Sequence, residues 1–429
     1  MKSLLAFLLV ALSVPVAAQT PSFRKSPPLT EAAPARAGMS AQRLARIDSM
    51  CRQAVAGGKV PGVVALVARK GKIVYYKAFG MADNQQGRAL HREDIFRIAS
   101  QSKALTATAV MMLWEEGRFQ LDDPISKYIP EFKNPQVLKT FRYQDTSYTT
   151  VPARSEITIR QLLTHTSGLG YGVIDAEESF KLIYRKAGIT DLFTTENISI
   201  AESVRKLAKL PLHHQPGEKY TYSEGLDVLG YFVELMSGMP FDVFLRKRLL
   251  DPLQMNDTWF YLPAAKANRL VAVQKADNGQ WRPYPVTFYD PDYPVKGARR
   301  FFSGGAGLSS TAKDYATFLQ MYLNGGELNG VRILSRTTIQ SMMGNQIGKL
   351  WAETDRHYGL AFGVLTAQGQ DKGGQGSEGT FDWGGYFNTQ YFADPKEQTI
   401  GILLKQTQGA GSDDTAWKFR LLVGQAIDD

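Results

Sequence analysis

The chain has 429 residues, a formal net charge of +9 and 44% hydrophobic residues, a composition typical of a globular protein with one large domain or two subdomains. The positive excess is spread along the chain without a basic run, which argues against a nucleic-acid-binding protein. The single cysteine, Cys51, excludes an intrachain disulfide and lies on the apolar face of a predicted helix, which indicates a buried thiol.

The first 38 residues are predicted to lie outside the folded domain. A lysine, an apolar run over residues 4–14 and the sequence Val16-Ala17-Ala18 indicate a secretory signal over residues 1–18, which predicts a periplasmic or secreted protein. Residues 19–38 are rich in proline and alanine and predict a flexible leader. No later apolar run reaches the roughly 18 residues of a membrane span, so no integral membrane segment is expected after signal cleavage.

Helix and strand patterns then follow one another in a definite order. Ser40 is predicted to cap a helix that ends at Gly57-Gly58. Residues 62–69 and 73–79 are β-branched, apolar runs joined by a short polar turn, which predicts a β-hairpin. Further helices are predicted at 159–164, 198–209, 226–236 and 242–250, strands at 358–365, 389–393 and 399–405, and a last helix at 415–427.

These patterns predict an α/β (α+β) fold, with one catalytic domain over residues 39–429. Strands near both ends of the chain most simply share one antiparallel sheet, built from about 39–99 and 296–429. A helical subdomain of about 100–295 is predicted to be inserted beside that sheet. Catalytic groups are expected to collect in the cleft between the two parts.

A serine and a lysine three residues apart, Ser100 and Lys103, form the strongest candidate for a catalytic pair. At that spacing both side chains lie on one face of a helix, so the amine can reach the hydroxyl. The helix that follows is apolar on nearly every side, and its N-terminus carries a partial positive charge. Both features disfavour the ammonium form and favour a lysine that can accept the serine proton.

The Ser-x-x-Lys pattern occurs four times and is weak by itself. The four copies begin at Ser22, Ser100, Ser203 and Ser310. Ser22 and Ser203 are predicted to lie on the surface. Ser310 is the closest rival, but Ser309 or Ser310 is expected to cap a helix over 310–323 and Lys313 to lie on its polar face. Only Lys103 is predicted to be buried.

Other catalytic arrangements have little support. The chain has no Gly-x-Ser-x-Gly sequence, which argues against an α/β-hydrolase, and its five histidines show no His-x-x-x-His spacing. Neither a metal nor another cofactor is therefore expected. His165, which precedes Thr166-Ser167-Gly168, is predicted to stabilise a turn at the end of a helix.

The order of several motifs resembles the serine β-lactamase and penicillin-binding-protein superfamily, and within it the class C β-lactamase-like family VIII carboxylesterases. The resemblance extends from about residue 40 to the end of the chain. The motifs that carry it are Phe96-Arg97-Ile98-Ala99-Ser100-x-x-Lys103, Leu162-Leu163-Thr164-His165-Thr166-Ser167-Gly168-Leu169, Pro216-Gly217-Glu218-Lys219-Tyr220-x-Tyr222-Ser223, Gly305-Ala306-Gly307-Leu308-Ser309-Ser310-Thr311-Ala312 and Trp383-Gly384-Gly385.

The resemblance implies Ser100 as nucleophile and Lys103 and Tyr222 as proton-transfer groups. Tyr222-Ser223-Glu224 stands at the family's Tyr-x-Asn motif, so Glu224 departs from the pattern. Tyr220 is the alternative if the register differs by two residues, and a structural tyrosine is the alternative role for Tyr222. A carboxylate near Lys103 opposes its role as base, so Glu224 is expected to point out of the cleft or to make activity depend on alkaline pH.

The third motif of the family corresponds to Trp383-Gly384-Gly385, on a strand that edges the cleft. The resemblance implies an oxyanion hole made by the backbone N–H groups of Ser100 and Tyr386. Trp383 replaces a cation that binds substrate carboxylates, which favours esters over β-lactams and D-alanyl-D-alanine peptides. A packing role for Trp383 is the alternative.

The resulting hypothesis is an exported serine hydrolase that works through an acyl-enzyme on Ser100, most simply a carboxylesterase on short acyl esters. The alternative with the same machinery is a β-lactamase or D-alanyl-D-alanine carboxypeptidase on peptidoglycan-type substrates. A hydrolase that has lost activity and serves as a binding protein is a third hypothesis, for which Glu224 is the only sign. The expected partner is a small molecule in each hydrolase case.

Overall fold

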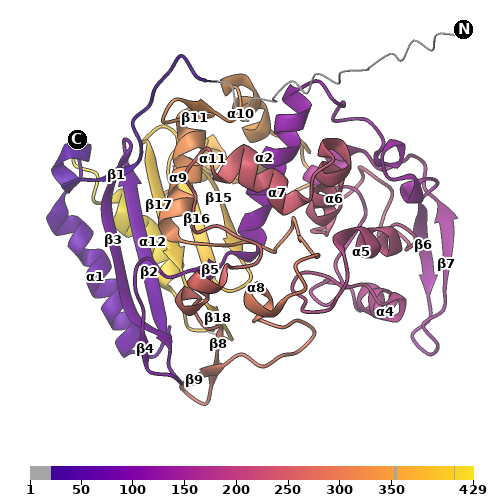
Figure 1. Cartoon of the computed structure of the whole chain (residues 1–429), viewed down its shortest axis with the longest axis horizontal. Coiled ribbons are helices and arrows are strands. Elements are labelled where there is room, and N and C mark those ends of the chain that lie inside the picture. The colour runs from indigo at the N-terminus through magenta and orange to yellow at the C-terminus, as the bar shows by residue number, and fades with distance from the viewer. Residues whose placement is uncertain (1–20, 352–354, 410) are drawn as a thin grey trace, which may run out of the picture.

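The computed structural model describes residues 21–351, 355–409 and 411–429. Its centre is a nine-stranded sheet with the order β1-β3-β2-β17-β16-β15-β14-β13, in which β4 pairs with β3 (Figure 1). All pairs of this sheet except one are antiparallel, which agrees with the predicted antiparallel sheet. The exception is β1, which is parallel to β3. The strands of this sheet are β1 (Thr30–Glu31), β2 (Gly62–Arg69), β3 (Lys72–Asp83), β4 (Arg88–Ala89), β13 (Arg356–Tyr358), β14 (Gly363–Leu365), β15 (Phe381–Gly385), β16 (Thr389–Asp394) and β17 (Thr399–Leu404).

Helices cover both faces of the sheet, because its central strands are apolar on both sides. Helices α1 and α12 pack on one face against Val63, Ala65 and Val67 of β2. Helices α2 and α9 cover the other, against Val64 and Leu66. The helices are α1 (Ala41–Ala56), α2 (Ser102–Glu115), α3 (Ile159–Leu163), α4 (Glu178–Ala187), α5 (Ile200–Leu207), α6 (Gly225–Ser237), α7 (Phe241–Leu245), α8 (Tyr293–Lys296), α9 (Ala312–Leu323), α10 (Arg336–Met343), α11 (Ala367–Asp371) and α12 (Thr415–Gly424).

The elements at the two ends of the chain agree with the sequence patterns. The Ser40 hydroxyl accepts a hydrogen bond from the N–H of Arg43 and caps α1, which ends before Gly57. The first hairpin, β2–β3, forms as predicted, and β17 pairs with β2, so strands from both ends of the chain share one sheet. Cys51 is buried in α1, which confirms a core thiol, and burial raises its pKa to about 12.

The region between the two groups of sheet strands, predicted as a helical subdomain, also contains strands. It contains two hairpins, β6 (Gln136–Phe141) with β7 (Tyr148–Pro152) and β8 (Gln274–Asp277) with β9 (Gln280–Pro283). Figure 1 shows β6–β7 beside α4 and α5, at the side away from the central sheet. These short strands are largely polar, so their apolar alternation is too weak to show in the sequence. Likewise, the strand predicted over 358–365 is a hairpin, β13–β14.

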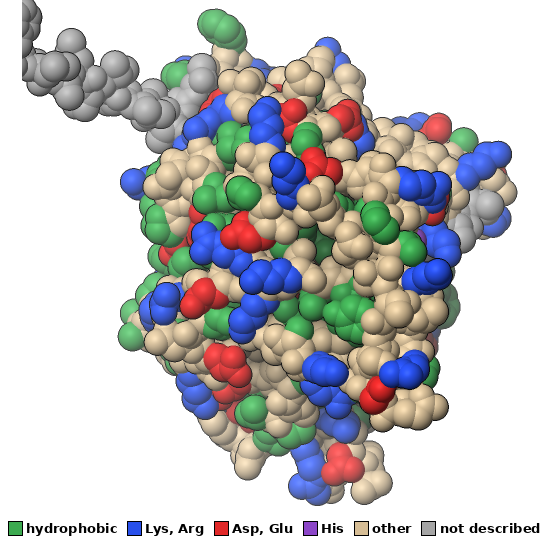
Figure 2. All heavy atoms as spheres, turned by 90° about the vertical axis from the view of Figure 1, so that its right-hand side faces the viewer, with side chains coloured by type: hydrophobic (Ala, Val, Ile, Leu, Met, Phe, Trp, Pro, Cys, Tyr) green, Lys and Arg blue, Asp and Glu red, His purple; other side chains and the backbone are tan. Residues whose placement is uncertain are grey.

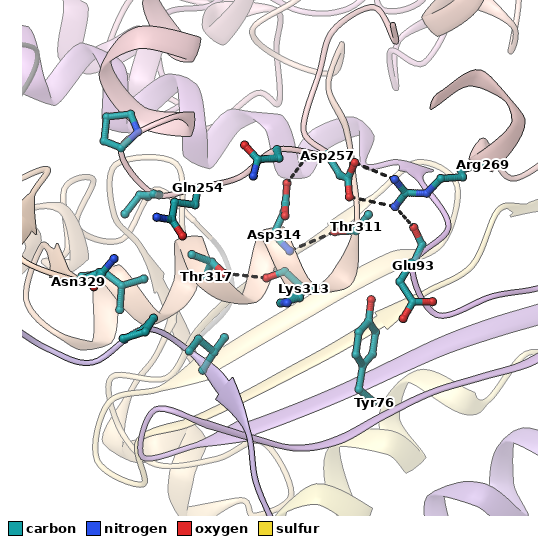
Figure 3. Close-up of a pocket in the computed structure, with 16 residues that line it drawn as sticks. Tyr76, Glu93, Gln254, Asp257, Arg269, Thr311, Lys313, Asp314, Thr317 and Asn329 are labelled. Atoms are coloured by element: carbon teal, nitrogen blue, oxygen red, sulfur yellow. Dashed lines mark hydrogen bonds and ion pairs between the residues drawn. The ribbon is translucent and has the colours of Figure 1, made fainter. Parts of the chain in front are cut away.

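The predicted flexible leader over 19–38 is wrong for residues 21–38. The N–H of Ser22 donates to the carbonyl of Gly330, and the N–H and hydroxyl of Ser26 donate to the buried carboxylate of Glu327. Leu29 is buried, next to a cavity of about 320 Å³ that also touches Tyr76 and the start of α9 (Figure 3). The prolines leave most of the leader extended, with one short 3-10 helix at Pro34–Ala37, and the buried Glu327 binds it at Ser26. Residues 1–20, which include the predicted signal, lie outside the described residues.

A packed leader predicts a stability effect at Leu29. Leu29→Ala is expected to lower the free energy of unfolding by about 2 kcal/mol, because it removes a buried side chain at the margin of the core. The matched control is Phe23→Ala in the same leader, where the ring is fully exposed, and a change of less than about 0.5 kcal/mol is expected. Urea denaturation of both variants checks this. Equal values for the two would mean that the leader is detached in solution.

The surface carries mixed charge. Figure 2 looks onto the side of the molecule that lies at the right of Figure 1, and there basic and acidic side chains are interspersed around hydrophobic ones. Among the described residues, no helix has by itself the length and apolarity needed to cross a membrane. The helical segments 225–237 and 241–250 reach that length and apolarity only together, and they are bent by 77° relative to each other.

Candidate active site

Ser100 lies where an extended segment turns into helix α2. Before it, β5 (Phe96–Arg97) pairs with β10 (Ser309–Ser310), and Ser100 itself lies in the single 3-10 turn, Ala99–Gln101, that leads into the helix. Ala99 makes the turn with a φ of 46°, a left-handed conformation that costs an alanine on the order of 1 kcal/mol. The buried guanidinium of Arg97 donates to the carbonyl oxygens of Val271 (2.7 Å) and Pro291, which holds the segment in place. Ser100 is left half-buried between buried neighbours.

Lys103 is fully buried and directed at Ser100. Its Nζ lies 3.3 Å from the Ser100 Oγ, 3.0 Å from the Tyr171 Oη and 2.8 Å from the Gly305 carbonyl oxygen. A neutral amine has two N–H bonds and one lone pair. Once the amine is neutral, its two N–H bonds can be donated to Gly305 and Tyr171, which leaves the lone pair facing the Ser100 hydroxyl. The arrangement therefore suits a lysine base.

The carbonyl that holds Lys103 is itself fixed by α6. Asp227 accepts hydrogen bonds from the Ser303 hydroxyl (2.5 Å) and the Gly305 N–H (3.3 Å). Glycine is required at position 305, because a Cβ there would lie 2.4 Å from the Asp227 carboxylate. Burial raises the pKa of Asp227, and the nearby Lys103 opposes this rise. Asp227 thus positions Lys103 through the backbone of the 303–308 segment.

Two tyrosines, Tyr222 and Tyr171, lie beside Lys103. The amine lies 4.6 Å from the ring centre of Tyr222 and 5.5 Å from that of Tyr171. Tyr171 is buried, and burial together with Tyr222 and nearby carboxylates holds its pKa well above 10. Tyr222 is half-buried and so borders the open side of the site. The structure therefore places the Tyr222 ring beside Lys103, while Tyr220 lies farther along, 5.8 Å from His165.

His165 positions the second motif and follows α3 in a left-handed turn with a φ of 56°. Its Nδ1 accepts a hydrogen bond from the N–H of Ser223, and its carbonyl accepts one from the N–H of Thr221. Its ring packs on Tyr222, with 4.6 Å between ring centres. Burial and the charge of Lys103 hold the pKa of His165 well below 6.5, so the ring is neutral. The side chain orders a turn, as predicted, and also supports Tyr222.

The third motif lies on the half of β15 that extends past its neighbour. Strand β14 pairs only with Phe381 and Asp382, so Trp383-Gly384-Gly385 borders the site beside Ser100. A Cβ on Gly385 would lie 2.5 Å from the carbonyl oxygen of Ile98, so glycine lets β15 approach the nucleophile segment closely. The Gly385 carbonyl accepts from the N–H of Asn388 (2.9 Å), which fixes the peptide whose N–H belongs to Tyr386.

Glu224 is buried and does not face the open side of the site. It is 3% exposed at the N-terminus of α6, its N–H donates to the Gly170 carbonyl (3.1 Å), and its Oε1 accepts no hydrogen bond from the described residues. Burial, with Asp191 and Asp227 nearby, raises its pKa well above 4.5. The carboxyl is buried with Asp191, Asp227 and Lys103 as charged neighbours, so Glu224 does not point to solvent. Because its pKa is raised, Glu224 keeps its proton to higher pH, and a protonated carboxyl has a weaker electrostatic effect on Lys103 than a carboxylate.

The raised pKa of Glu224 predicts how stability depends on pH. The native state keeps this proton where the unfolded chain has lost it, so the free energy of unfolding falls as pH rises above the usual carboxyl range. Glu224→Gln removes that contribution. Urea denaturation at about pH 5 and about pH 8 is expected to show a smaller fall for the variant than for the wild type. Identical falls would mean that Glu224 titrates normally in the folded protein.

The other Ser-x-x-Lys copies do not form catalytic pairs. The lysines at positions 25, 206 and 313 are exposed. Ser310 is buried with its hydroxyl 2.7 Å from that of Thr258, and the cap of α9 is Thr311 instead of Ser309 or Ser310, because β10 still includes both serines. The predicted surface position of Ser22 and Ser203 is wrong, since both side chains are buried; Ser203 donates to the carbonyl of Thr190.

Sequence reasoning missed two residues of the site, Tyr171 and Asp227. Tyr171 directly follows the Ser167-Gly168-Leu169-Gly170 turn, and Asp227 lies one helical turn after Glu224. Their proximity to recognised motifs is the only signal that could have pointed to them. Within the described parts of the chain, no group of three or more His, Cys, Asp or Glu side chains is placed to hold a metal ion.

Comparison with known proteins agrees with this geometry. A family model described as beta-lactamase matches residues 47–425. The chain belongs to the beta-lactamase family. Two relatives are each 33% identical: esterase EstB of Burkholderia gladioli, over 87% of this chain and 92% of that protein, and protein Rv1367c of Mycobacterium tuberculosis, over 83% and 88%. The solved structure of EstCE1, described as a hydrolase with promiscuous acyltransferase activity, has a TM-score of 0.76 at 27% identity and covers 90% of this chain and 99% of its own.

Membership of the beta-lactamase family confirms the resemblance inferred from the motifs and the predicted antiparallel sheet flanked by helices. The protein is therefore a serine hydrolase of this family.

Proposed function

We propose that the protein is an exported carboxylesterase that hydrolyses short-chain acyl esters through an acyl-enzyme on Ser100. The observation that carries the proposal is Trp383, a neutral ring on the third-motif strand, 6.0 Å from the ring of Tyr222. It leaves this position without the cation that a substrate carboxylate needs. The esterase name of EstB and the hydrolase description of EstCE1 also support it.

Acylation begins with the transfer of the Ser100 proton to Lys103, assisted by Tyr222. The Ser100 Oγ forms a bond to the ester carbonyl carbon, and the carbonyl oxygen becomes an oxyanion. The N–H groups of Ser100 and Tyr386 hold this oxyanion, because both peptides are fixed before the substrate arrives. Tyr222 or Lys103 then protonates the leaving alcohol as its bond to the carbonyl carbon breaks.

Deacylation repeats these steps with water. The Lys103–Tyr222 pair takes a proton from a water molecule, whose oxygen attacks the acyl carbon. The Ser100 Oγ leaves and regains its proton, and the free acid dissociates.

The preference for a short acyl group is supported by the packing behind Tyr386. The aromatic side chains there are buried and in mutual contact: Phe193, Tyr289, Tyr293 and Phe387. Tyr386 lies 5.7 Å from Tyr289, so the space behind Tyr386 is filled by the protein itself. A long acyl chain would have to displace packed rings, which costs several buried contacts.

The competing function is a β-lactamase or D-alanyl-D-alanine carboxypeptidase, which shares the family and the Ser100–Lys103–Tyr222 set. Purified protein is to be assayed on nitrophenyl acetate and on a chromogenic cephalosporin. Losing a charge-assisted hydrogen bond to the substrate carboxylate costs roughly 1.5 to 3 kcal/mol, so we expect kcat/KM for the ester to be higher by roughly ten- to a hundredfold. Trp383→Lys is expected to narrow this gap.

A cephalosporin rate equal to or above the ester rate would overturn the esterase proposal in favour of the β-lactamase. Labelling of Ser100 by a fluorophosphonate separates both from a binding protein without activity. The matched control is Ser100→Ala, which is expected to remain unlabelled.

A further inference from the structure

The position of Tyr222 fixes where the alcohol part of an ester lies. In the proposed mechanism the leaving oxygen lies within reach of Tyr222 or Lys103, which protonate it. Three rings among the described residues contact Tyr222, those of His165, Tyr171 and Trp383. The first two are buried and only Trp383 is half-buried. The alcohol part therefore extends from Tyr222 over Trp383.

Trp383 is one member of an aromatic wall made of Tyr220, Trp351 and Trp383, all half-buried. The rings of Tyr220 and Trp351 are stacked at 5.9 Å with 25° between their planes, and Trp351 lies 6.2 Å from Trp383. The buried ring of Tyr358 lies behind all three, at 5.3, 5.2 and 5.5 Å. The wall thus has a fixed base and presents rings toward the side on which the alcohol leaves.

Such a wall distinguishes flat rings from saturated ones. A planar π-system can stack or meet edge to face with Tyr220, Trp351 and Trp383, and each such ring pair contributes beyond the area it buries. A saturated ring of the same size buries a similar area but gains no such term. In the proposed function, the packed rings behind Tyr386 keep the acyl part small.

The geometry points to esters of aromatic alcohols with small acyl groups, such as benzyl acetates, as the preferred substrate class, with the aromatic wall as the site for the alcohol ring. This inference rests on the proposed esterase function and adds to it which side of the ester is recognised.

The test uses three esters that separate ring type from ring position. Benzyl acetate and cyclohexylmethyl acetate share an acyl group and differ in the aromaticity of the ring. Methyl phenylacetate is an isomer of benzyl acetate with the ring on the acyl side. We expect kcat/KM for benzyl acetate to exceed those of both other esters by about five- to tenfold.

Variants of the wall locate the preference. Trp351→Leu and Tyr220→Leu are each expected to reduce the benzyl over cyclohexylmethyl ratio to about twofold or less. The ratio is used because losses common to both substrates cancel. The matched control is Tyr143→Leu, an exposed ring beside β6, which is expected to leave the ratio unchanged.

The outcomes separate this inference from the proposed function. Clear hydrolysis of both acetates at equal rates would overturn the aromatic-alcohol inference and leave the esterase intact. Faster hydrolysis of methyl phenylacetate would overturn it by placing the ring on the acyl side. No hydrolysis of these esters or of nitrophenyl acetate would overturn the esterase function and this inference with it.

Discussion

Ser100→Ala is expected to lower kcat on nitrophenyl acetate by on the order of 10⁴-fold or more, and Lys103→Ala by a similar factor. The two groups lie 3.3 Å apart and act as one unit, so the double variant is expected to lose little further. Steady-state kinetics of the three variants measures this. Lys103 also holds Tyr171 and Gly305, so thermal unfolding is needed to show that each variant is folded.

The matched control is Ser310→Ala in the rival Ser-x-x-Lys sequence. The Ser310 hydroxyl bonds to Thr258 inside the protein, so its loss is expected to lower the melting temperature slightly and to leave kcat nearly unchanged. Full activity in Ser100→Ala, or loss of activity in a folded Ser310→Ala, would place the nucleophile elsewhere.

Tyr222→Phe is expected to lower kcat by on the order of 10³-fold, because it removes the hydroxyl that assists proton transfer in a half-buried position beside Lys103. Tyr171→Phe removes a hydroxyl that is buried, stays protonated and touches Lys103 at 3.0 Å without reaching the open side. It orients the amine, so a loss of about tenfold is expected. Rates on nitrophenyl acetate across the pH range compare the two variants directly.

Two outcomes for these variants would contradict the role given to Tyr222. If Tyr171→Phe costs more than Tyr222→Phe, the proton passes through Tyr171 and the second motif serves only as support. Two folded variants with nearly wild-type rates would leave Lys103 as the sole proton carrier.

The elements of the fold that carry a strong local sequence pattern could be predicted from the sequence. The cap at Ser40, the β-branched runs of the first hairpin and the apolar run of β17 each determine their own element, and the sheet follows because strands from both chain ends need partners. The short polar hairpins β6–β7 and β8–β9 escaped prediction, since their pairing depends on tertiary context. The packing of the leader could not be predicted for a related reason, because Glu327, which binds Ser26, is distant in sequence.

In the site, too, the residues placed by local sequence could be predicted, and those placed by tertiary packing could not. Ser100 lies in the 3-10 turn that leads into α2, and Lys103 lies in the first turn of α2, so local spacing alone places the amine beside the hydroxyl. Tyr222 and Trp383 required an ordered set of motifs. Tyr171, Asp227 and the buried position of Glu224 come from the way α6 packs against the 303–308 segment, which no local pattern encodes.

The pairing of β2 with β17 has a consequence for how the protein is made. Leu404 and Val64 are partners in the middle of the sheet, although they lie near opposite ends of the chain. A ribosome therefore completes α2 and the Ser100–Lys103 pair long before β17 emerges to cover the edge of β2. Until then the apolar edge of β2 stays open to pairing with other chains, so the nascent protein is aggregation-prone and without hydrolase activity. Folding of such distant pairs is slow, and the appearance of hydrolase activity would report the docking of the last strands.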